Sequence, residues 1–277
     1  MPELPEVETV ARDLQRWVAG AVIDEVEVRW ERTIRHPLPV ERFAAEVRGA
    51  RIAKVERRAK SVLLRLDDGR LLSIALRMTG ALLVAPPAAP DDRYARVVFH
   101  LADGRQLRFR DVRKFGRIGL WRRVGQAFSR HGPEPLSGSF TAARLRERLR
   151  RRSGRLKSLL LDQSFIAGVG NIYADEALWH ARLHPLRRAG TLTLAEVARL
   201  HRALRRVLRQ GITNRGTTFS DYVSADGEPG ANAEQLSVYR RTGQPCLRCR
   251  RQIQRMVVGQ RATHWCAHCQ PLAGAAA

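Results

Sequence analysis

The segment PCLRCRRQIQRMVVGQRATHWCAHCQ, residues 245–270, carries the clearest fold signal in the chain. It contains two Cys-x-x-Cys pairs with 16 residues between them: Cys246 and Cys249, then Cys266 and Cys269. Four thiolates are the donor set of a closed, tetrahedral zinc site that leaves no position for water. Between the pairs, a short apolar run followed by Gly259-Gln260 predicts a β-hairpin whose turn presents Arg261. The segment therefore predicts a zinc finger with one structural Zn²⁺.

Two other interpretations of the cysteines and histidines exist. A pair of disulfides requires an oxidising compartment, and the N-terminal residues contain acids but no apolar core of a secretory signal. His264 and His268 are alternative metal ligands, but because four cysteines already complete the site, we expect both to be surface histidines. No apolar run approaches the ~18 residues of a membrane helix. We therefore expect a cytoplasmic, nucleoid-associated protein.

The chain is strongly basic. Its 277 residues include 50 lysines and arginines against 27 acidic residues, a formal net charge of +23 at pH 7. Such a surplus favours a polyanionic partner, because neutralised phosphates release counterions on binding. Adaptation to heat or to a GC-rich genome is a simpler explanation of the arginine content. The clustering of arginines around the cysteine pairs favours nucleic acid instead.

The rest of the sequence divides by its periodicity. Apolar residues at helical spacing over 5–18 are followed by short strand-like runs up to residue 121, with hairpin signals at Asp68-Gly69 and Asp103-Gly104. After Gly132-Pro133 the periodicity becomes helical, over 141–152, 173–182 and 194–209. A polar stretch around 226–230 then predicts a loop before the cysteines.

These patterns predict an α+β multidomain protein. We expect an N-terminal antiparallel β-sandwich domain with an N-terminal helix at 1–131 and a helical domain at 132–225. A loop and the C-terminal β-hairpin zinc finger are expected at 226–277, with the finger itself at 238–272.

The first residues, Met-Pro-Glu-Leu-Pro-Glu, predict covalent chemistry. Removal of Met1 is usual before proline and would leave Pro2 with a free secondary amine. A neutral amine can attack the anomeric carbon of a nucleotide and form an iminium, an electron sink that lets phosphate leave by elimination. Glu3 and Glu6 are then candidates for a proton donor and a water-orienting or accepting group. The simpler alternative is that acids in the first helical turn only stabilise the helix dipole.

A series of motifs extends this interpretation through nearly the whole chain. In order they are PELPEVET (2–9), RRAK (57–60), RMTG (77–80), DVRKFG (111–116), GPEPL (132–136), GVGNIYADE (168–176), GTT (216–218) and QRATHWC (260–266). Together they resemble formamidopyrimidine-DNA glycosylase, a bacterial family that removes 8-oxoguanine and ring-opened purines. The resemblance implies a β-sandwich lobe, a helix–two-turn–helix lobe and a zinc finger, in a monomer that acts on damaged double-stranded DNA.

The resemblance also implies catalytic roles. Pro2 is similar to the family's Schiff-base nucleophile, and Glu3 to the acid that protonates the sugar ring oxygen or the leaving group, with Glu6 as a further catalytic carboxylate. Lys60 is similar to the group that binds a phosphate next to the lesion and assists β-elimination. Arg261 resembles the arginine that grips phosphates around the flipped nucleotide and is associated with δ-elimination. The implied enzyme is a bifunctional DNA glycosylase and AP lyase of base excision repair.

Further positions are similar to DNA contacts of the family. Residues that fill the space left by a flipped base are Met78, Arg113 and Phe115. Backbone-contacting positions are Arg152, Lys157 and Asn171. Tyr94 stands where a histidine often contacts DNA, and Ala75 also departs from the usual pattern, which puts the phosphate grip there in doubt. The loop at 217–235 is expected to cover the damaged base.

Two other functions remain open at this point. The sister endonuclease VIII group has the same scaffold and acts on oxidised pyrimidines, but it resembles a PEGPE start and lacks the Met78, Arg113 and Phe115 set. A non-catalytic zinc-ribbon protein that binds nucleic acid is the alternative from a different class, and Pro2, Glu3 and Lys60 argue against it.

Overall fold

The computed structural model describes residues 1–219, 222, 224–225 and 227–272. It divides into two compact units, Met1–Ser129 with Ile212–Ala233, and Arg130–Gly211 with Glu234–Ala277. The return of 212–233 to the first unit was not foreseen from the sequence. The division into domains at 1–131, 132–225 and 226–277 stays a prediction. Each unit is described by itself below.

The first unit is a β-sandwich with two sheets. One sheet has the order β1 (Ile23–Val28), β7 (Ala95–Leu101), β8 (Gln106–Asp111) and β6 (Gly80–Ala85). The other has the order β2 (Ile34–His36), β9 (Arg117–Trp121), β5 (Leu71–Ala75), β4 (Ser61–Leu66) and β3 (Ile52–Arg58). The expected sandwich is confirmed, with tight turns at Gly69 and Gly104, whose φ angles are +84° and +85°.

The sandwich departs from a purely antiparallel arrangement in one strand pair. β2 runs parallel to β9, whereas every other paired strand in the two sheets is antiparallel. β2 enters the second sheet directly after the 3-10 turn η1 (Glu31–Thr33) that follows β1 of the first sheet. Since no hairpin joins it to β9, its direction is not restricted by a tight turn.

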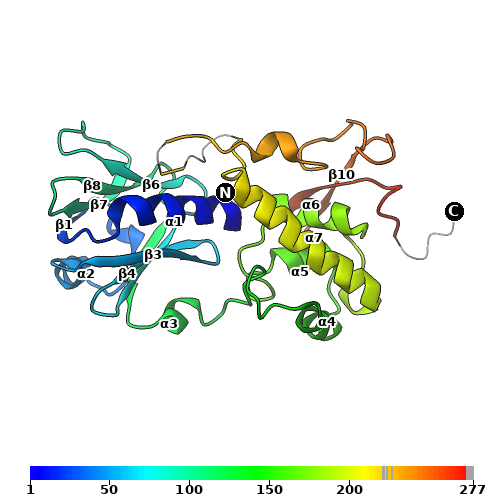
Figure 1. The fold of residues 1–277 in the computed structure, drawn as a ribbon, viewed down its shortest axis with the longest axis horizontal. Coiled ribbons are helices and arrows are strands. Elements are labelled where there is room, and N and C mark those ends of the chain that lie inside the picture. The colour runs from blue at the N-terminus through cyan, green and yellow to red at the C-terminus, as the bar shows by residue number, and fades with distance from the viewer. Residues whose placement is uncertain (220–221, 223, 226, 273–277) are drawn as a thin grey trace. The chain divides into compact units, whose positions relative to one another are not determined.

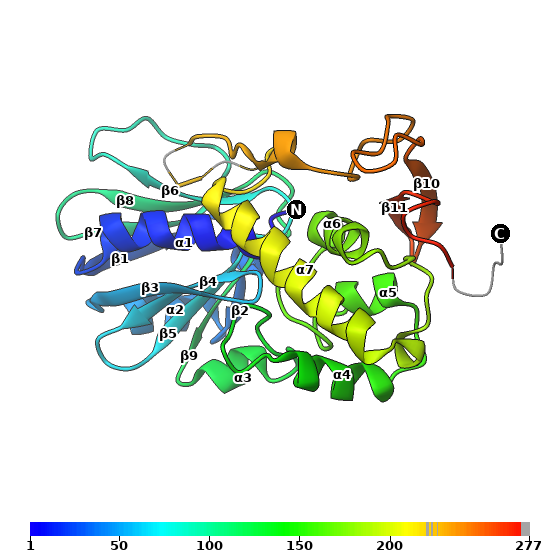
Figure 2. The ribbon, with the colours of Figure 1, turned by 45° about the vertical axis from the view of Figure 1, so that its right-hand side comes forward.

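Helix α1 (Leu4–Val18) closes one side of the sandwich. It contacts β3 and β4 of one sheet and β6 of the other, and it lies between the two sheets in both ribbon views (Figures 1 and 2). Its apolar face, Val7, Val10, Leu14 and Val18, is at most 1% exposed and belongs to the sandwich core. Two short helices, α2 (Val40–Val47) and α3 (Val124–Phe128), complete the unit. The helix expected over 5–18 is therefore confirmed.

The second unit is helical and carries the C-terminal hairpin. Its helices are α4 (Ala142–Arg150), α5 (Leu156–Leu161), α6 (Asn171–Ala181) and α7 (Leu194–Thr213), the last of which ends just past the unit boundary. The 3-10 turn η2 (Ala189–Thr191) lies within this unit, and η3 (Asn232–Gln235) spans the boundary between the units. The hairpin pairs β10 (Gln254–Val258) with β11 (Arg261–Trp265). Three of the helices were expected from the sequence. α5 was not, since six residues are too few to show a helical period.

Among the described residues, no helix combines the length and the apolar character needed to cross a bilayer.

Candidate active site and metal centre

Pro2 and Glu3 lie immediately before α1, and both side chains are buried. The Glu6 carboxylate holds this segment from the first turn of the helix. Its Oε2 accepts a hydrogen bond from the Glu3 backbone N–H at 2.8 Å, and its Oε1 accepts from the Thr217 N–H at 2.8 Å. Glu6 is 1% exposed. One buried carboxylate therefore connects the residue after Pro2 to the GTT segment within the first unit.

The GTT segment approaches Glu6 closely because its first residue is glycine. Gly216 has φ +87°, and a Cβ there would lie 2.9 Å from Glu6 Cγ. The Tyr222 hydroxyl donates to the Glu6 carbonyl at 3.3 Å and to the Arg215 carbonyl at 3.1 Å. The expected lid at 217–235 lies partly outside the described residues, so its role as a cover stays a prediction.

The hydrogen bonds of Glu6 favour an anchoring role for this residue. Each of its oxygens accepts a backbone N–H, which ties the carboxylate to the Glu3 and Thr217 backbone. A positioning role therefore fits this geometry better than proton donation. Catalytic roles of Glu3 and Glu6 stay predictions.

Lys60 lies at the tip of a two-residue hairpin turn. Arg58 pairs with Ser61 at the ends of β3 and β4, and Ala59 adopts φ +54° in the turn between them. Arg57 supports the turn, since its Nη1 donates to the Ala59 carbonyl at 3.0 Å and its Nε contacts Glu8 of α1 at 3.0 Å. α1 therefore bears Pro2 and Glu3 at its start and supports the Lys60 turn through Glu8.

Met78, Arg113 and Phe115, which we call the wedge residues, lie together on the surface of the first unit. Met78 is 38% exposed and Phe115 is 46% exposed. Arg113 lies between them, with Nη1 3.3 Å from Met78 Sδ and Cζ 4.8 Å from the centre of the Phe115 ring. Single apolar side chains on a surface are common, but large ones that lie together can mark an interaction site. Their exposure fits insertion into a duplex, which stays a prediction.

Tyr94 is surrounded by arginines in the same unit. The guanidinium carbons of Arg93 and Arg110 lie 4.7 Å and 4.8 Å from the ring centre, and Arg93 Nη2 donates to the Tyr94 hydroxyl at 2.6 Å. Ala75 is the last residue of β5. The surroundings of Tyr94 are therefore strongly cationic, which supports the predicted DNA contact.

In the second unit, side chains from two successive helical turns of α6 form hydrogen bonds to the C-terminal hairpin. Asn171 Nδ2 donates to the Ala262 carbonyl at 2.9 Å, next to the exposed Arg261. Asp175 Oδ2 accepts from the His264 backbone N–H at 3.0 Å and lies 3.1 Å from His264 Nδ1. These contacts fix the strand that begins with Arg261.

Glu176 holds the segment that leads to the hairpin. Its carboxylate accepts hydrogen bonds from the backbone N–H groups of Ser237, Val238 and Tyr239 at 2.8 to 2.9 Å. Burial raises the pKa of the Glu176 carboxyl, and the three N–H groups oppose that shift. The carboxylate therefore supplies the hydrogen-bond acceptors that a backbone carbonyl would supply in a helix or a sheet.

Lys157 is fully buried. Its Nζ lies 2.5 Å from Asp175 Oδ1 and 3.0 Å from the Asn171 carbonyl, and both Lys157 and Asp175 side chains are 0% exposed. Contact with DNA by Lys157 stays a prediction, but its side chain is directed into the unit. Arg152, by contrast, is exposed in the segment after α4.

The expectation of surface histidines was half wrong. His268 is exposed, whereas His264 is 5% exposed and is held by Asp175. The hairpin strand that bears His264 packs against α6 rather than facing solvent on both sides. A single-sequence pattern does not show which side of a two-stranded hairpin is covered.

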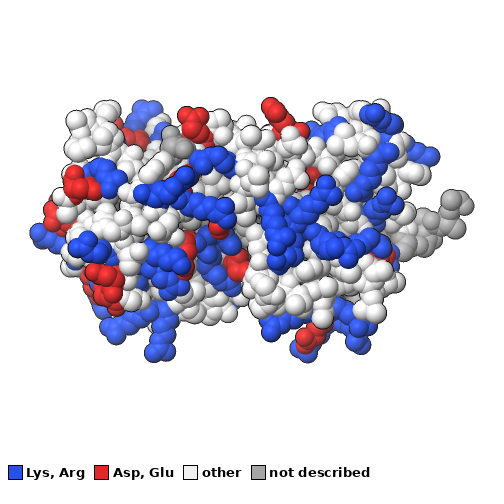
Figure 3. All heavy atoms as spheres, viewed as in Figure 1, with Lys and Arg blue, Asp and Glu red and all other residues white. Residues whose placement is uncertain are grey.

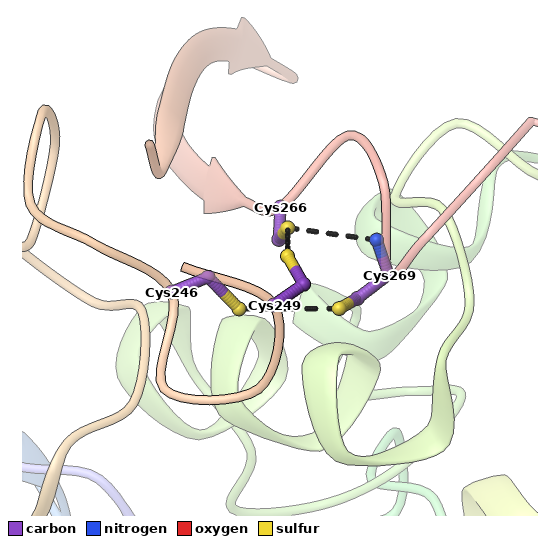
Figure 4. A group of neighbouring side chains, drawn as sticks. All are labelled: Cys246, Cys249, Cys266 and Cys269. Atoms are coloured by element: carbon purple, nitrogen blue, oxygen red, sulfur yellow. Dashed lines mark hydrogen bonds between the residues drawn. The ribbon is translucent and has the colours of Figure 1, made fainter. Parts of the chain in front are cut away.

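The four cysteine sulfurs converge from two loops (Figure 4). Each lies within 4.8 Å of the others, and the Cys249–Cys266 and Cys246–Cys269 sulfur separations are 3.4 Å and 3.9 Å. Sulfurs at the corners of a tetrahedron with Zn–S bonds of about 2.3 Å are about 3.8 Å apart. The donor set and its spacing fit one structural zinc ion.

The surroundings of one ligand, Cys246, also favour a metal, whereas burial raises the pKa of the Cys266 and Cys269 thiols. Burial tends to raise the pKa of the Cys246 thiol, but hydrogen bonds from the N–H groups of Arg248 and Cys249 help to bring it down to about 6. A thiolate at neutral pH is the form that binds metal. Arg248 also donates to the Trp179 carbonyl of α6 at 2.6 Å, so the first cysteine loop is attached to that helix.

Basic side chains are spread over one face of each unit (Figure 3). On the face in Figure 3, lysine and arginine atoms are spread over the elements of both, and acidic atoms are fewer. In the second unit, Arg144, Arg146, Arg150, Arg151 and Arg152 are all exposed on or just after α4. This distribution agrees with the charge argument for a polyanionic partner.

Three supporting carboxylates, Asp111, Asp175 and Glu176, were not foreseen from the sequence. All three are at most 3% exposed. A detectable signal existed, because Asp175 and Glu176 interrupt an otherwise apolar helix and buried acids require specific partners.

Comparisons with known proteins agree with this geometry. Residues 1–118 match the formamidopyrimidine-DNA glycosylase N-terminal domain, 131–223 the H2TH domain of that enzyme, and 243–272 a zinc finger found in FPG and IleRS. The last match, together with the cysteine geometry, identifies the metal as a single structural zinc ion.

Full-length relatives are similar over almost the whole chain. The formamidopyrimidine-DNA glycosylases of Roseiflexus sp. and Chloroflexus aggregans are each 50% identical to it, over 98% of this chain and 100% and 99% of theirs. The crystal structure of MutM (Fpg) from Thermus thermophilus superposes with a TM-score of 0.88 at 42% identity, covering 98% of this chain and 99% of that one. Lactococcus lactis Fpg bound to DNA containing N7-benzyl-Fapy-dG gives 0.90 at 35% identity, covering 98% and 100%. The chain belongs to the formamidopyrimidine-DNA glycosylase family.

Proposed function

We propose that this protein is a bifunctional DNA glycosylase and AP lyase of base excision repair that removes oxidised purines, 8-oxoguanine and formamidopyrimidines, from duplex DNA. The observation that carries the proposal is the N-terminal Pro2-Glu3 pair, buried and held by Glu6, in a chain of this family. The partner is damaged double-stranded DNA, and the protein acts as a monomer in the cytoplasm, at the nucleoid.

The first chemical step replaces the damaged base by the protein. After removal of Met1, the Pro2 amine attacks C1′ of the damaged nucleotide, the C1′–N9 bond breaks, and Glu3 supplies the proton to the sugar ring oxygen or the leaving purine. The Pro2 nitrogen then loses its proton and the C1′–O4′ bond breaks. The ring oxygen becomes a hydroxyl, and an iminium joins the Pro2 nitrogen to C1′. Glu6 keeps Glu3 and the adjoining Pro2 in place through its hydrogen bond to the Glu3 N–H.

Strand cleavage follows from the iminium. Loss of a C2′ proton breaks the C3′–O bond and releases one phosphate by β-elimination, with Lys60 bound to a neighbouring phosphate. Loss of a further proton breaks the C5′–O bond by δ-elimination. Arg261 binds the phosphates around the flipped nucleotide during this step. Hydrolysis of the iminium frees Pro2, and the product is a one-nucleotide gap with phosphate at both ends. Zinc takes no part in these steps and holds the hairpin that carries Arg261.

Borohydride trapping tests the proposal. The protein is mixed with a duplex that contains one 8-oxoguanine opposite cytosine, reduced, digested, and analysed by peptide mass spectrometry, after intact mass has shown that Met1 is absent. We expect the adduct on Pro2. A matched control inserts one alanine between Met1 and Pro2, which turns the Pro2 nitrogen into an amide and leaves α1 unchanged, since the helix begins at Leu4. An adduct on Pro2 in the control, or none in the processed wild type, contradicts the mechanism.

The same assay separates the other functions. Excision from a thymine-glycol duplex in preference to 8-oxoguanine would indicate an enzyme of the endonuclease VIII type. Tight binding to both duplexes without excision or adduct would indicate a non-catalytic nucleic-acid-binding protein.

A further inference from the structure

Two surface loops of the first unit carry the wedge residues. Residues 76–79 connect β5 to β6 and contain Met78, and residues 112–116 connect β8 to β9 and contain Arg113 and Phe115. The loops are distant in sequence, since Met78 and Arg113 are 35 positions apart, yet these two side chains are in contact. Something must hold them in one arrangement, because exposed loops are otherwise mobile.

The Asp111 carboxylate connects the two loops. Its Oδ1 accepts hydrogen bonds from the Thr79 hydroxyl at 2.5 Å and from the Arg113 N–H at 3.2 Å. Its Oδ2 accepts from the Gly116 N–H at 2.7 Å. The Arg113 N–H also reaches Thr79 Oγ1 at 3.1 Å. A single side chain therefore binds the residue after Met78 and both ends of the segment that bears Arg113 and Phe115.

Asp111 is itself held firmly and is inaccessible. Its side chain is buried, its backbone N–H donates to the Tyr94 carbonyl at 2.9 Å, and its carbonyl accepts from Arg96 Nε at 2.7 Å. Because solvent does not reach the carboxylate, it is not placed to contact DNA. Its bonds serve the loops alone.

The backbone on both loops is in an unusual conformation next to the wedge residues. Arg77, immediately before Met78, has φ +60°, and Lys114, immediately before Phe115, has φ +61°. Residues with a Cβ adopt this region rarely, and it persists where the surroundings hold it. Lys114 is further held by its ammonium, which lies 3.9 Å from the centre of a Trp30 ring.

Gly116 allows the carboxylate to approach. A Cβ on this residue would lie 3.1 Å from Asp111 Oδ2 and 2.2 Å from the Phe109 ring. Any larger residue would displace the segment from Asp111. The glycine is therefore required by the close packing that brings its N–H to the carboxylate.

We propose that Asp111 is a positioning residue that assembles Met78, Arg113 and Phe115 into one preformed wedge before DNA binds, and thereby sets discrimination between bases opposite the lesion. The inference rests on the proposed function. Arg113 discriminates only if its guanidinium meets the orphaned base at a defined position, since hydrogen-bond readout depends on geometry. Asp111 determines that position through the Arg113 N–H and through Thr79.

Asp111→Asn tests the inference with little change in shape. The amide has one oxygen and one NH₂ group, so at least one of the donors from Thr79, Arg113 or Gly116 loses its acceptor. The readout is the ratio of kcat/KM for 8-oxoguanine opposite cytosine to that opposite adenine. A ratio is unaffected by the fraction of folded protein. We expect it to fall on the order of tenfold, which corresponds to ~1.4 kcal/mol.

Two comparisons make the test specific. Asp68→Asn applies the same substitution to an exposed hairpin carboxylate of the same unit and should leave the ratio unchanged. In an Arg113→Ala background, Asp111→Asn should cause no further fall, because it acts through Arg113. Should Asp111→Asn not fold, Thr79→Val removes the same hydroxyl tie, and Thr79→Ser restores it.

An unchanged ratio in Asp111→Asn, or equal ratios in Thr79→Val and Thr79→Ser, would overturn the inference. So would a further fall in the Arg113→Ala background. The proposed function fails separately, by absence of excision or of a Pro2 adduct in the wild type, whereas these outcomes arise with an active wild type.

Discussion

The buried ion pair between Lys157 and Asp175 leads to the sharpest stability prediction. Its nitrogen and oxygen are 2.5 Å apart, and both side chains are 0% exposed. Lys157→Met removes the cation and leaves the carboxylate in the protein interior. Removing one partner of a buried pair costs about 3–5 kcal/mol. We expect the lower end of this range, because the Asp175 carboxylate retains the His264 N–H at 3.0 Å.

The matched control is an exposed pair in the same unit. Arg151 and Glu147 are 2.8 Å apart, with side chains 77% and 63% exposed. Arg151→Met should cost less than about 1 kcal/mol. Because a chain with two units need not unfold in one step, the assay is native-state hydrogen exchange of α6 peptides across a urea series. This measurement reports the opening free energy of the helix that bears Asp175.

A double substitution separates stability from positioning. Lys157→Met with Asp175→Leu replaces the pair by apolar side chains and should recover part of the lost free energy, since no charge is left buried but the buried His264 N–H loses its acceptor. It also removes the acceptor that holds His264, so the strand that begins with Arg261 loses one of its ties to α6. We expect a stable variant whose δ-elimination product is reduced relative to its β-elimination product.

Three outcomes would refute this reasoning. Lys157→Met costing no more than Arg151→Met would show that the pair contributes nothing beyond a surface contact. A double variant as unstable as the single one would point to packing rather than charge. Weakened DNA binding in Lys157→Met with unchanged α6 opening would mean that Lys157 meets phosphate directly.

Three further predictions concern metal, pH and salt. Cys249→Ser should lower zinc content and DNA affinity while the first unit stays folded, because thiolate ligation couples zinc to the folding of the finger alone. Zinc analysis and a binding titration measure the two losses, and hydrogen exchange of α1 shows whether the first unit stays folded. Burial, with Arg206 and Arg248 nearby, lowers the pKa of His180 from 6.5 to about 4. The folded state then binds fewer protons than the unfolded state, so α6 opening should become easier as pH falls from about 6.5 to about 4, and His180→Phe should reduce that slope. With about six phosphates contacted, log K for DNA should fall with log salt at a slope near −5 in a binding titration.

Each of these has a clear contrary result. Full DNA affinity in zinc-free Cys249→Ser would make the finger dispensable. An unchanged pH slope in His180→Phe would assign the effect to other groups. A salt-independent affinity would exclude the phosphate contacts that the net charge of +23 suggests.

Local sequence was enough for the elements whose pattern is short-range. Asp68-Gly69 and Asp103-Gly104 predicted hairpins because a turn depends on its own residues, and the structure has a positive φ at both glycines. The zinc finger was predictable for the same reason, since two cysteine pairs and a hairpin define it. The parallel pairing of β2 with β9 was not predictable, because the chain passes from one sheet to the other before β2 and the two strands are far apart in sequence.

The candidate site divides in the same way. By itself, the sequence determined the kinds of chemical group available, a proline amine beside carboxylates, four thiolates and a large cationic surplus, because these depend on residue identity alone. Only the tertiary structure decided which groups are used for support. In the structure, Lys157 and His264 are buried beside Asp175. Both Glu6 oxygens accept hydrogen bonds from backbone N–H groups. Asp111 connects two loops that are distant in sequence. The reason is that burial and hydrogen-bond partners are set by long-range packing, which no local pattern of residues records.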